Sequence, residues 1–357
     1  MKSEQVDSAA EYRRQMQSQS FRRVQTIGVR GRILDRNGVV LADNITTTSL
    51  VLVPNQIEDK ELVSKTLSEI LGVTKEEMDK HVYKETSIER VHPEGRNLSY
   101  DIADKIIARN PNKEEYVCAA GISPSGSVHI GNFRDVATSF FVVKALQKKG
   151  KKAKLLFSWD DFDRLRKVPS NVQQITQGFE ENIGKPYTFI TDPFNQDESY
   201  GVHFEKEFEE SLKRLGVEVD ARYQTKNYTS GLYREHIIHS LNKRKEIYDI
   251  LMKFKTQDAN DEDRENYYPI SIYCEHSLKD NTKVTSYDPQ TGDIEFYCSD
   301  CQQTHKVNVN TYNLIKLVWK VDWPMRWLYE NVDFEPGGKD HASINGSYDT
   351  SKEISKE

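Results

Sequence analysis

The stretch between Tyr116 and Asp161 constrains the fold of this chain more than any other. "YVCAAG" (Tyr116–Gly121) is a short apolar run typical of a buried strand, and "KAKLLFSWDD" (152–161) is a second such run. Between them, apolar residues from Phe133 to Val143 recur at helical spacing, and the pattern ends at Gly150. A strand, a loop, a helix and a second strand form the βαβ unit of a parallel sheet. The sequence therefore predicts an α/β fold with helices covering a parallel sheet.

The loop inside this unit, "ISPSGSVHIGN" (122–132), is the strongest candidate for a binding site. A loop between a strand and a helix lies at the carboxyl edge of a parallel sheet, where free N–H groups and the helix dipole favour an anion. Gly126 permits close approach of a ligand to the backbone, and His129 and Asn132 add hydrogen-bond donors. The pattern indicates a phosphate site. The alternative is a tight structural connection in which His129 serves only the fold.

Composition excludes some classes of protein. Among the 357 residues, 36% are hydrophobic, and no apolar run approaches the roughly 18 residues of a bilayer-spanning helix. We therefore expect no membrane segment. Because the first residues include no apolar signal region, we also expect a cytoplasmic protein. The net charge of −6 argues against a globally basic nucleic-acid binder. The lysine run between 144 and 154 is a solvated helix end on our interpretation, with tRNA contact as the alternative.

Cysteine spacing predicts a metal site in the last third of the chain. Cys274, Cys298 and Cys301 supply three thiolates, and His276 is the predicted fourth ligand with His305 as the alternative. Four cysteines in a chain of 357 residues are too few for a disulfide scaffold, which favours a reducing compartment. We expect a structural Zn²⁺ in a small β-rich insert over residues 263–318, and unligated cysteines are the alternative.

Residues 1–98 differ from the rest and predict an N-terminal α+β module. Asn37-Gly38 within "RGRILDRNGVVLADN" (30–44) is a strong hairpin signal, and Glu58–Leu71 has the spacing of an amphipathic helix. With "ERVHPEGR" (89–96), this segment resembles the non-catalytic N-terminal region of class B penicillin-binding proteins over about residues 10–98. The resemblance leaves two further readings open, a cell-wall module and two unrelated fragments joined near Ser99.

Four blocks in the remaining chain carry a second resemblance. "GISPSGSVHIGNFRDV" (121–136), "SWDDFDRLRKVP" (158–169), "WKVDWPMRW" (319–327) and "DFEPGGKDHA" (333–342) together resemble the class I lysyl-tRNA synthetases. That resemblance implies a Rossmann catalytic domain whose first half covers residues 99–262 and whose second half begins at 319–357. It also implies ATP with Mg²⁺, lysine and tRNA(Lys) as the molecules that the protein binds.

The resemblance also assigns roles to individual residues. It implies phosphate and catalytic contacts, a surrounding ATP site and a lysine site. The implied catalytic residues are His129, Asn132, Lys339 and His341. The implied ATP-binding residues are Ser123, Ser125, Gly126, His129, Gly131, Asn132, Gly338 and Asp340. The implied lysine-binding residues are Gly121, Ser123, Asp160, Asp161, Trp323 and Glu335.

Two questions stay open at this stage. The carboxylate that pairs with the lysine ammonium is Asp160, Asp161 or Glu335, and turn or cap chemistry also explains the first two. Class I synthetases carry a Lys-Met-Ser-Lys-Ser-type loop, and no such sequence precedes Glu357. We therefore expect impaired lysine activation, with a non-catalytic ATP- or tRNA-binding protein as the alternative.

Overall fold

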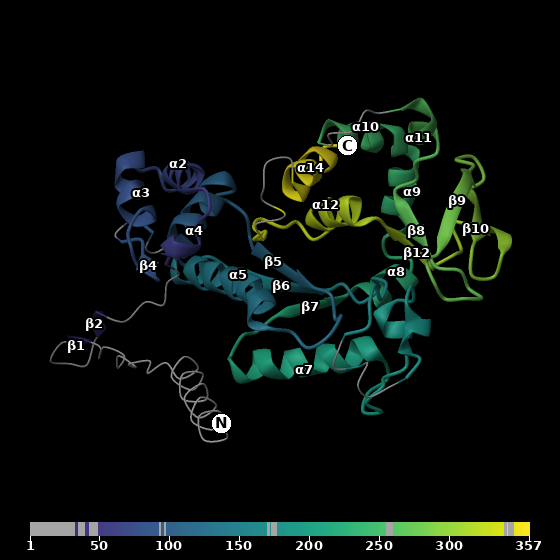
Figure 1. The fold of residues 1–357 in the computed structure, drawn as a ribbon, viewed down its shortest axis with the longest axis horizontal. Coiled ribbons are helices and arrows are strands. Elements are labelled where there is room, and N and C mark those ends of the chain that lie inside the picture. The colour runs from purple at the N-terminus through teal and green to yellow at the C-terminus, as the bar shows by residue number, and fades with distance from the viewer. Residues whose placement is uncertain are drawn as a thin grey trace, which may run out of the picture. The chain divides into compact units, whose positions relative to one another are not determined.

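The structure is a computed structural model that describes residues 33–34, 40–42, 49–92, 94–95, 98–169, 172, 177–254, 260–338, 341 and 346–357. It divides into two compact units, Met1–Thr46 and Thr47–Glu357. In the first unit, β1 (Ile33–Leu34) pairs antiparallel with β2 (Val40–Ala42), which confirms the predicted hairpin (Figure 1). The Asn37-Gly38 turn lies outside the described residues.

The second unit begins with a small α+β segment that has its own core. It contains β3 (Val51–Leu52), η1 (Pro54–Gln56), α2 (Lys60–Leu71), α3 (Lys75–Val82) and β4 (Glu89–Arg90), with β3 and β4 antiparallel. The Thr74 side chain caps α3 in a reciprocal capping box with Glu77. Leu52, Met78, Val82 and Val91 are buried together. This segment agrees with the predicted α+β character of the N-terminal region.

A parallel sheet lies at the centre of the remaining chain. Its strands are β5 (Tyr116–Ile122), β6 (Ala153–Trp159) and β7 (Asp220–Tyr223), in the order β5-β6-β7. A single parallel bridge between Cys118 and Phe334 places a distant segment on the free side of β5, where the Ala119 N–H donates to the Phe334 carbonyl at 2.7 Å. The predicted parallel α/β sheet is confirmed.

Three helices pack around this sheet, namely α4 (Leu98–Arg109), α5 (Ile130–Lys148) and α7 (Tyr200–Arg214). Val136 and Leu146 of α5 share a core with Phe157 and Trp159 of β6 and with Phe208 of α7. The two strands β5 and β6 are almost continuously buried because packing covers both of their faces. Among the described residues, no helix is long and apolar enough to cross a membrane.

The chain between β6 and the C-terminal helices builds a second, larger core. It contains η2 (Phe179–Asn182), η3 (Tyr187–Phe189), α8 (Gln224–Thr229), α9 (Arg234–Asn242), α10 (Arg244–Lys253) and α11 (Asp261–Glu265). The strands that follow are β8 (Ile270–Ile272), β9 (Thr282–Tyr287), β10 (Asp293–Cys298), β11 (Gln303–Asn308) and β12 (Ile315–Leu317). The last helices are α12 (Trp319–Tyr329) and α14 (Ser347–Ile354).

The cysteine-bearing insert is β-rich, as predicted. Its antiparallel sheet has the order β11-β10-β9, and β12 pairs antiparallel with β8 beside it. Ile272, Ile294 and Leu317 of these strands share one buried cluster with Val321 of α12. The insert and α12 therefore form a continuous hydrophobic core.

Candidate functional site

The loop after β5 lies on the surface at the carboxyl edge of the sheet. His129 is the N-cap of α5, and its Nδ1 accepts a hydrogen bond from the Gly131 N–H at 3.0 Å. His129 and Asn132 are both exposed. The first residue of α7 holds the loop, because the Tyr200 hydroxyl donates a hydrogen bond to the Ser125 carbonyl at 2.8 Å. The positive end of the α5 dipole and two exposed polar side chains therefore face solvent here, which is an arrangement that suits an anion.

The absence of a side chain at Gly131 has a local structural reason that the sequence alone did not reveal. A Cβ at this position would lie 2.9 Å from His129 Cε1 and 3.0 Å from Nδ1. The glycine therefore lets the histidine ring fold over the first turn of the helix. At Gly121 a Cβ would lie 3.4 Å from the Ser158 carbonyl oxygen and 3.9 Å from Asp160 Oδ2, so a side chain there would point toward the end of β6.

The structure brings His341 from far along the chain to this edge. The His341 ring centroid lies 5.8 Å from that of Trp319 and 5.5 Å from that of Trp323, both on α12. Burial raises the pKa of Asp135 in α5, and the charges of Arg134 and His341 oppose that shift. His341 therefore packs against α12, and it is close enough to α5 for its charge to act on Asp135. Lys339 and Asp340 lie outside the described residues.

A buried ion pair fixes α12 to the end of β6. Arg326 of α12 donates from Nη1 to Asp160 Oδ1 at 2.7 Å and to Ser158 Oγ at 2.6 Å. Its Nη2 lies 3.0 Å from Asp322 Oδ2, one helical turn earlier. All four residues are buried. Asp160 thus already has a cationic partner inside the protein.

The same cluster continues to β12 and α8. Lys316 Nζ lies 2.5 Å from Asp163 Oδ1 and 3.7 Å from Asp322 Oδ2. The Tyr228 hydroxyl donates to Asp322, and burial raises the pKa of Tyr228 well above its usual value. Three carboxylates and two cations from three segments of the chain therefore meet in a largely buried cluster, where each charge has an oppositely charged neighbour.

The other two candidate carboxylates lie in different surroundings. Asp161 is buried and accepts the Thr225 N–H at 2.7 Å, and burial raises its pKa to about 7. Glu335 accepts the Trp327 Nε1–H at 2.6 Å, and burial raises the pKa of Glu335 although Arg326 opposes the shift. Trp323 stacks on Trp319 with ring centroids 4.9 Å apart, and it packs at a tilt against Trp327 with ring centroids 4.7 Å apart. Glu335 therefore lies beside an aromatic row.

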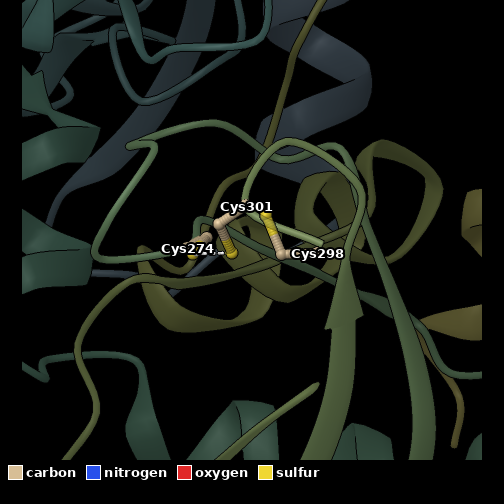
Figure 2. A group of neighbouring side chains, drawn as sticks. All are labelled: Cys274, Cys298 and Cys301. Atoms are coloured by element: carbon tan, nitrogen blue, oxygen red, sulfur yellow. Dashed lines mark hydrogen bonds between the residues drawn. The ribbon is translucent and has the colours of Figure 1, made fainter. Parts of the chain in front are cut away.

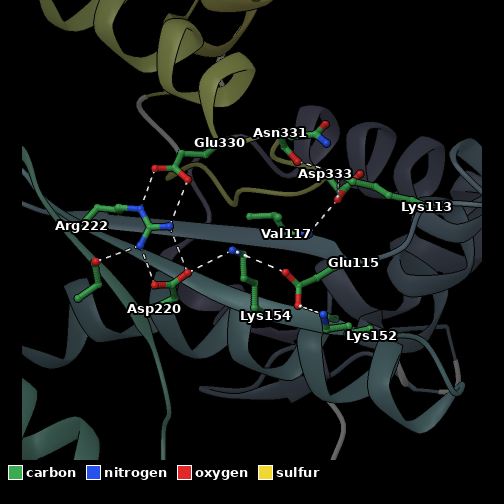
Figure 3. A network of polar contacts seen from close by, with 12 residues as sticks. Lys113, Glu115, Val117, Lys152, Lys154, Asp220, Arg222, Glu330, Asn331 and Asp333 are labelled. Atoms are coloured by element: carbon green, nitrogen blue, oxygen red, sulfur yellow. Dashed lines mark hydrogen bonds and ion pairs between the residues drawn. The ribbon is translucent and has the colours of Figure 1, made fainter. Parts of the chain in front are cut away.

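Two groups of ion pairs and hydrogen bonds hold the segment that leads to Glu335 against the sheet (Figure 3). Arg222 of β7 lies between Asp220 and Glu330, with Nη1 to Oδ1 at 2.6 Å and Nε to Oε1 at 2.8 Å. Lys113 Nζ lies 2.6 Å from Asp333 Oδ2, and the same oxygen accepts the Val117 N–H at 2.8 Å. These contacts position residues 330–334 along β5.

The three predicted cysteine ligands come together in the insert (Figure 2). Sγ of Cys274 lies 3.9 Å from Sγ of Cys301, and His305 Nε2 lies 3.1 Å from Cys301 and 3.7 Å from Cys274. Zn–S bonds of about 2.3 Å and Zn–N bonds of about 2.0 Å in a tetrahedron require ligand separations of roughly 3.5–3.8 Å. The Cys274–Cys301 and Cys274–His305 separations are close to these values, and His305 rather than His276 lies beside these two sulfurs.

His276 itself is exposed and lies 3.7 Å from Glu275. Ser277 occupies a further place beside the cluster, with Oγ 3.7 Å from Cys298 Sγ. His305 lies on β11, directly opposite Phe296 of β10. The hairpin that joins these strands explains why a histidine four residues after Cys301 reaches the thiolates.

Sequence reasoning missed the members of the buried ion cluster other than Asp160. The available signal was Asp322 and Arg326, a charged pair at i and i+4 inside the otherwise apolar "WKVDWPMRW". Charged residues on the buried face of a helix need oppositely charged partners. An Asp and an Arg one helical turn apart in an apolar segment therefore indicate a buried ion pair.

Two known families match different, partly overlapping segments of the chain. Residues 98–357 match the tRNA synthetases class I (K) family, and residues 26–127 match the Penicillin-binding Protein dimerisation domain. The two matches overlap across α4, β5 and the beginning of the loop. The structure assigns β5 and this loop to the parallel sheet.

Curated relatives are lysine–tRNA ligases. The protein of Streptomyces coelicolor is 37% identical over 284 residues, covering 71% of this chain and 49% of the relative. The Treponema pallidum protein is 39% identical over 254 residues, with coverage of 71% and 47%. The Pyrococcus horikoshii protein is 41% identical over 256 residues, with coverage of 72% and 48%. The chain spans about half the length of these relatives.

Proposed function

The chain belongs to the class I (K) tRNA synthetase family, and from this membership we propose that it activates lysine with ATP and transfers the lysyl group to tRNA(Lys). The observation that supports the proposal is the exposed His129 and Asn132 at the start of α5, with His341 near enough for its charge to act on Asp135 of the same helix. A lysine carboxylate would attack the α-phosphorus of ATP, forming lysyl-adenylate and releasing pyrophosphate. The protein's contribution is positioning and charge stabilisation.

ATP would bind across the loop and the segment around His341. His129 and Asn132 would donate to phosphate oxygens, and the α5 dipole would favour the same negative charge. Ser123, Ser125, Gly126 and Gly131 would line the loop. We assign Lys339 and Gly338 to the far side of the phosphates and Asp340 to the ribose, and Mg²⁺ would accompany the nucleotide.

Lysine would bind between Gly121 and the α12 aromatic row. Of the three carboxylates, Asp160 already pairs with Arg326, and Asp161 lies at a cavity beside α7. We therefore favour Glu335 as the partner of the lysine ammonium, with Trp323 against the aliphatic stem and Ser123 near the α-carboxylate. Glu335→Gln is expected to weaken lysine binding at least about tenfold, because it removes a charge-assisted hydrogen bond. ATP binding by the same variant should stay at the wild-type level.

We assign a structural Zn²⁺ to Cys274, Cys298, Cys301 and His305, in preference to His276. The metal would join the two ends of the insert, whose strands are too short to form a large core alone. Elemental analysis is expected to find about one zinc ion per chain in the wild type and in His276→Ala, and much less in His305→Ala. Full zinc retention in His305→Ala would remove this histidine from the ligand set.

Two measurements separate the ligase from the non-catalytic alternative. Titration calorimetry should detect saturable binding of ATP and of L-lysine to the full chain, with L-leucine as the control amino acid. Lysine-dependent exchange of labelled pyrophosphate into ATP then identifies the ligase. Binding of both substrates with no exchange identifies a protein that binds without activating, and no binding of either rejects the proposal.

A further inference from the structure

An acidic cavity lies on the α7 side of the sheet, away from the Asp160–Arg326 pair. It encloses about 500 Å³ and is lined by residues from the end of β6, from α7, from β7 and from α8. The residues that carry the argument are Asp161, Glu205, Glu209, Tyr223, Thr225 and Lys226. The size is that of a site for a small organic molecule rather than for a single ion.

One carboxylate in this cavity is buried without a partner. Glu205 is 4% exposed, and its Oε1 is completely buried with no hydrogen-bond partner among the described residues. Asp161, Glu209 and Glu198 all add negative charge around it, whereas Lys206 opposes them. Lys206 is itself engaged, because its Nζ lies 2.7 Å from Asp197 Oδ1. A buried carboxylate surrounded by other acids is costly unless it takes up a proton or a cation joins it.

The cavity's other acids are oriented by hydrogen bonds. Glu209 Oε1 accepts from Trp159 Nε1 at 2.9 Å and from the Tyr223 hydroxyl at 2.8 Å. Asp161 accepts from the Thr225 N–H. Glu205 is the exception in this group, because it lines the same cavity and its Oε1 has no hydrogen-bond donor among the described residues, which leaves it as the acceptor for a ligand.

The geometry disfavours a metal ion. Within the described part of the chain, the acidic, histidine and cysteine side chains close enough to share one ion form two groups, and neither includes Asp161, Glu205 or Glu209. Carboxylates that are spread around a cavity suit a longer cation. A primary ammonium has three donors and no acceptor, and its alkyl chain can lie along the cavity wall.

We propose that the cavity between α7, β7 and α8 binds a primary alkylammonium group, with the side-chain carboxyl groups of Glu205 and Asp161 as its partners. This site is separate from the lysine site proposed beside Glu335. The ammonium could belong to a free diamine or to the side chain of an amino acid, and the two sources share the same recognition chemistry.

The test is calorimetric titration of the full chain with 1,5-diaminopentane and, in a parallel arm, with L-lysine, in the presence and absence of MgCl₂. Wild type is expected to bind the diamine, and Glu205→Gln to weaken that binding at least about tenfold. The matched control Glu210→Gln, an exposed glutamate on the same helix, should bind as wild type does. Lys226→Gln removes a positive charge at the cavity and should strengthen binding about twofold or more.

The two arms distinguish the sources of the ammonium. Diamine binding that depends on Glu205, beside lysine binding that depends only on Glu335, assigns a free amine. Lysine binding with two sites, one of which is lost in Glu205→Gln, assigns an amino acid. The proposal is overturned if neither compound binds in a Glu205-dependent way, if Lys226→Gln has no effect, or if MgCl₂ competes with the diamine.

Discussion

The surface loop at residues 121–132 and the buried ion cluster under α12 lie at the same edge of one sheet and differ in almost every physical respect. In the loop, His129 and Asn132 are exposed, and their polar groups face solvent. In the cluster, Asp160, Asp322 and Arg326 are buried, and Arg326 forms ion pairs with both carboxylates. The exposed loop is therefore the proposed ligand site, whereas the buried cluster holds α12 against the sheet.

The difference teaches how to separate binding residues from supporting residues in this fold. Charged residues near a site are not evidence of substrate contact when the protein already pairs them, as Arg326 pairs Asp160. His129, in contrast, is exposed, and the hydrogen bond that it accepts from the Gly131 N–H is local to its own helix end. Substitutions in the cluster should therefore affect stability first, and substitutions in the loop should affect ligand binding first.

The largest expected effect is on stability, from Arg326→Met in the cluster. Removing the guanidinium leaves Asp160 and Asp322 buried without their main cation, which costs about 3–5 kcal/mol. Urea unfolding followed by tryptophan fluorescence measures this loss. The control Arg134→Met removes an exposed arginine from α5 and should change the free energy of unfolding little. A loss below about 1 kcal/mol in Arg326→Met would contradict the assigned role of the cluster.

The next effect is on nucleotide binding, from His129→Ala in the loop. We expect ATP affinity to fall about tenfold to a hundredfold because a donor to phosphate is lost. The free energy of unfolding should fall by only about 1 kcal/mol, the usual cost of an N-cap. His129→Asn, which keeps the cap acceptor, should restore the stability and not the affinity. The comparison between the two regions fails if stability falls more than binding does.

A smaller effect concerns Glu205, which contrasts with the paired acids of the cluster. Burial raises the pKa of Glu205 to about 8 from a model-compound value of 4.5. The folded protein therefore holds a proton that the unfolded chain releases, and stability should decline as the pH rises through this interval. The charges facing Glu205 are Asp161, Glu209 and Glu198 against Lys206, with Lys226 lining the same cavity.

Glu205→Gln should raise the free energy of unfolding by about 1 kcal/mol at mildly alkaline pH and flatten its pH dependence. Thermal melts across this range, with Glu210→Gln as the control, measure the change. An unchanged slope in Glu205→Gln would show that another group carries the titration.

The smallest expected effect comes from Gly131→Ala. The new Cβ would displace the His129 ring, which should weaken ATP binding severalfold while changing the free energy of unfolding by less than about 1 kcal/mol. A double-mutant cycle with His129→Ala tests the cause, because the alanine should have no further effect on ATP binding once the imidazole is absent. Additive effects of the two substitutions would place the role of Gly131 elsewhere.

The parts of the fold that were predictable are those whose signal is local. The apolar run at Tyr116–Gly121, the loop and the helix after it gave the parallel sheet, and the cysteine spacing gave the thiolate cluster. The proposal of His305 over His276 as a ligand depends on a strand pairing, because β10 and β11 bring His305 back toward Cys301. That register could not be derived from ligand spacing alone.

The buried cluster shows where local reasoning ends. Ser158 and Arg326 are far apart in sequence, and their contact at 2.6 Å depends on how α12 packs against the sheet. Asp160 could be identified as a candidate carboxylate from its block, but its pairing with Arg326 came only from the tertiary structure. Glu205 lies on the amphipathic helix α7, and its sequence pattern did not predict that this glutamate is buried.

The most direct test of the central claim, that the loop at 121–132 and His341 form one adenylate site, is titration of the chain with a non-hydrolysable lysyl-adenylate analogue. We predict saturable binding of one molecule per chain that is lost or greatly weakened in His129→Ala and retained in Glu210→Gln. Equal affinity of wild type and of a folded His129→Ala protein for the analogue would contradict the account.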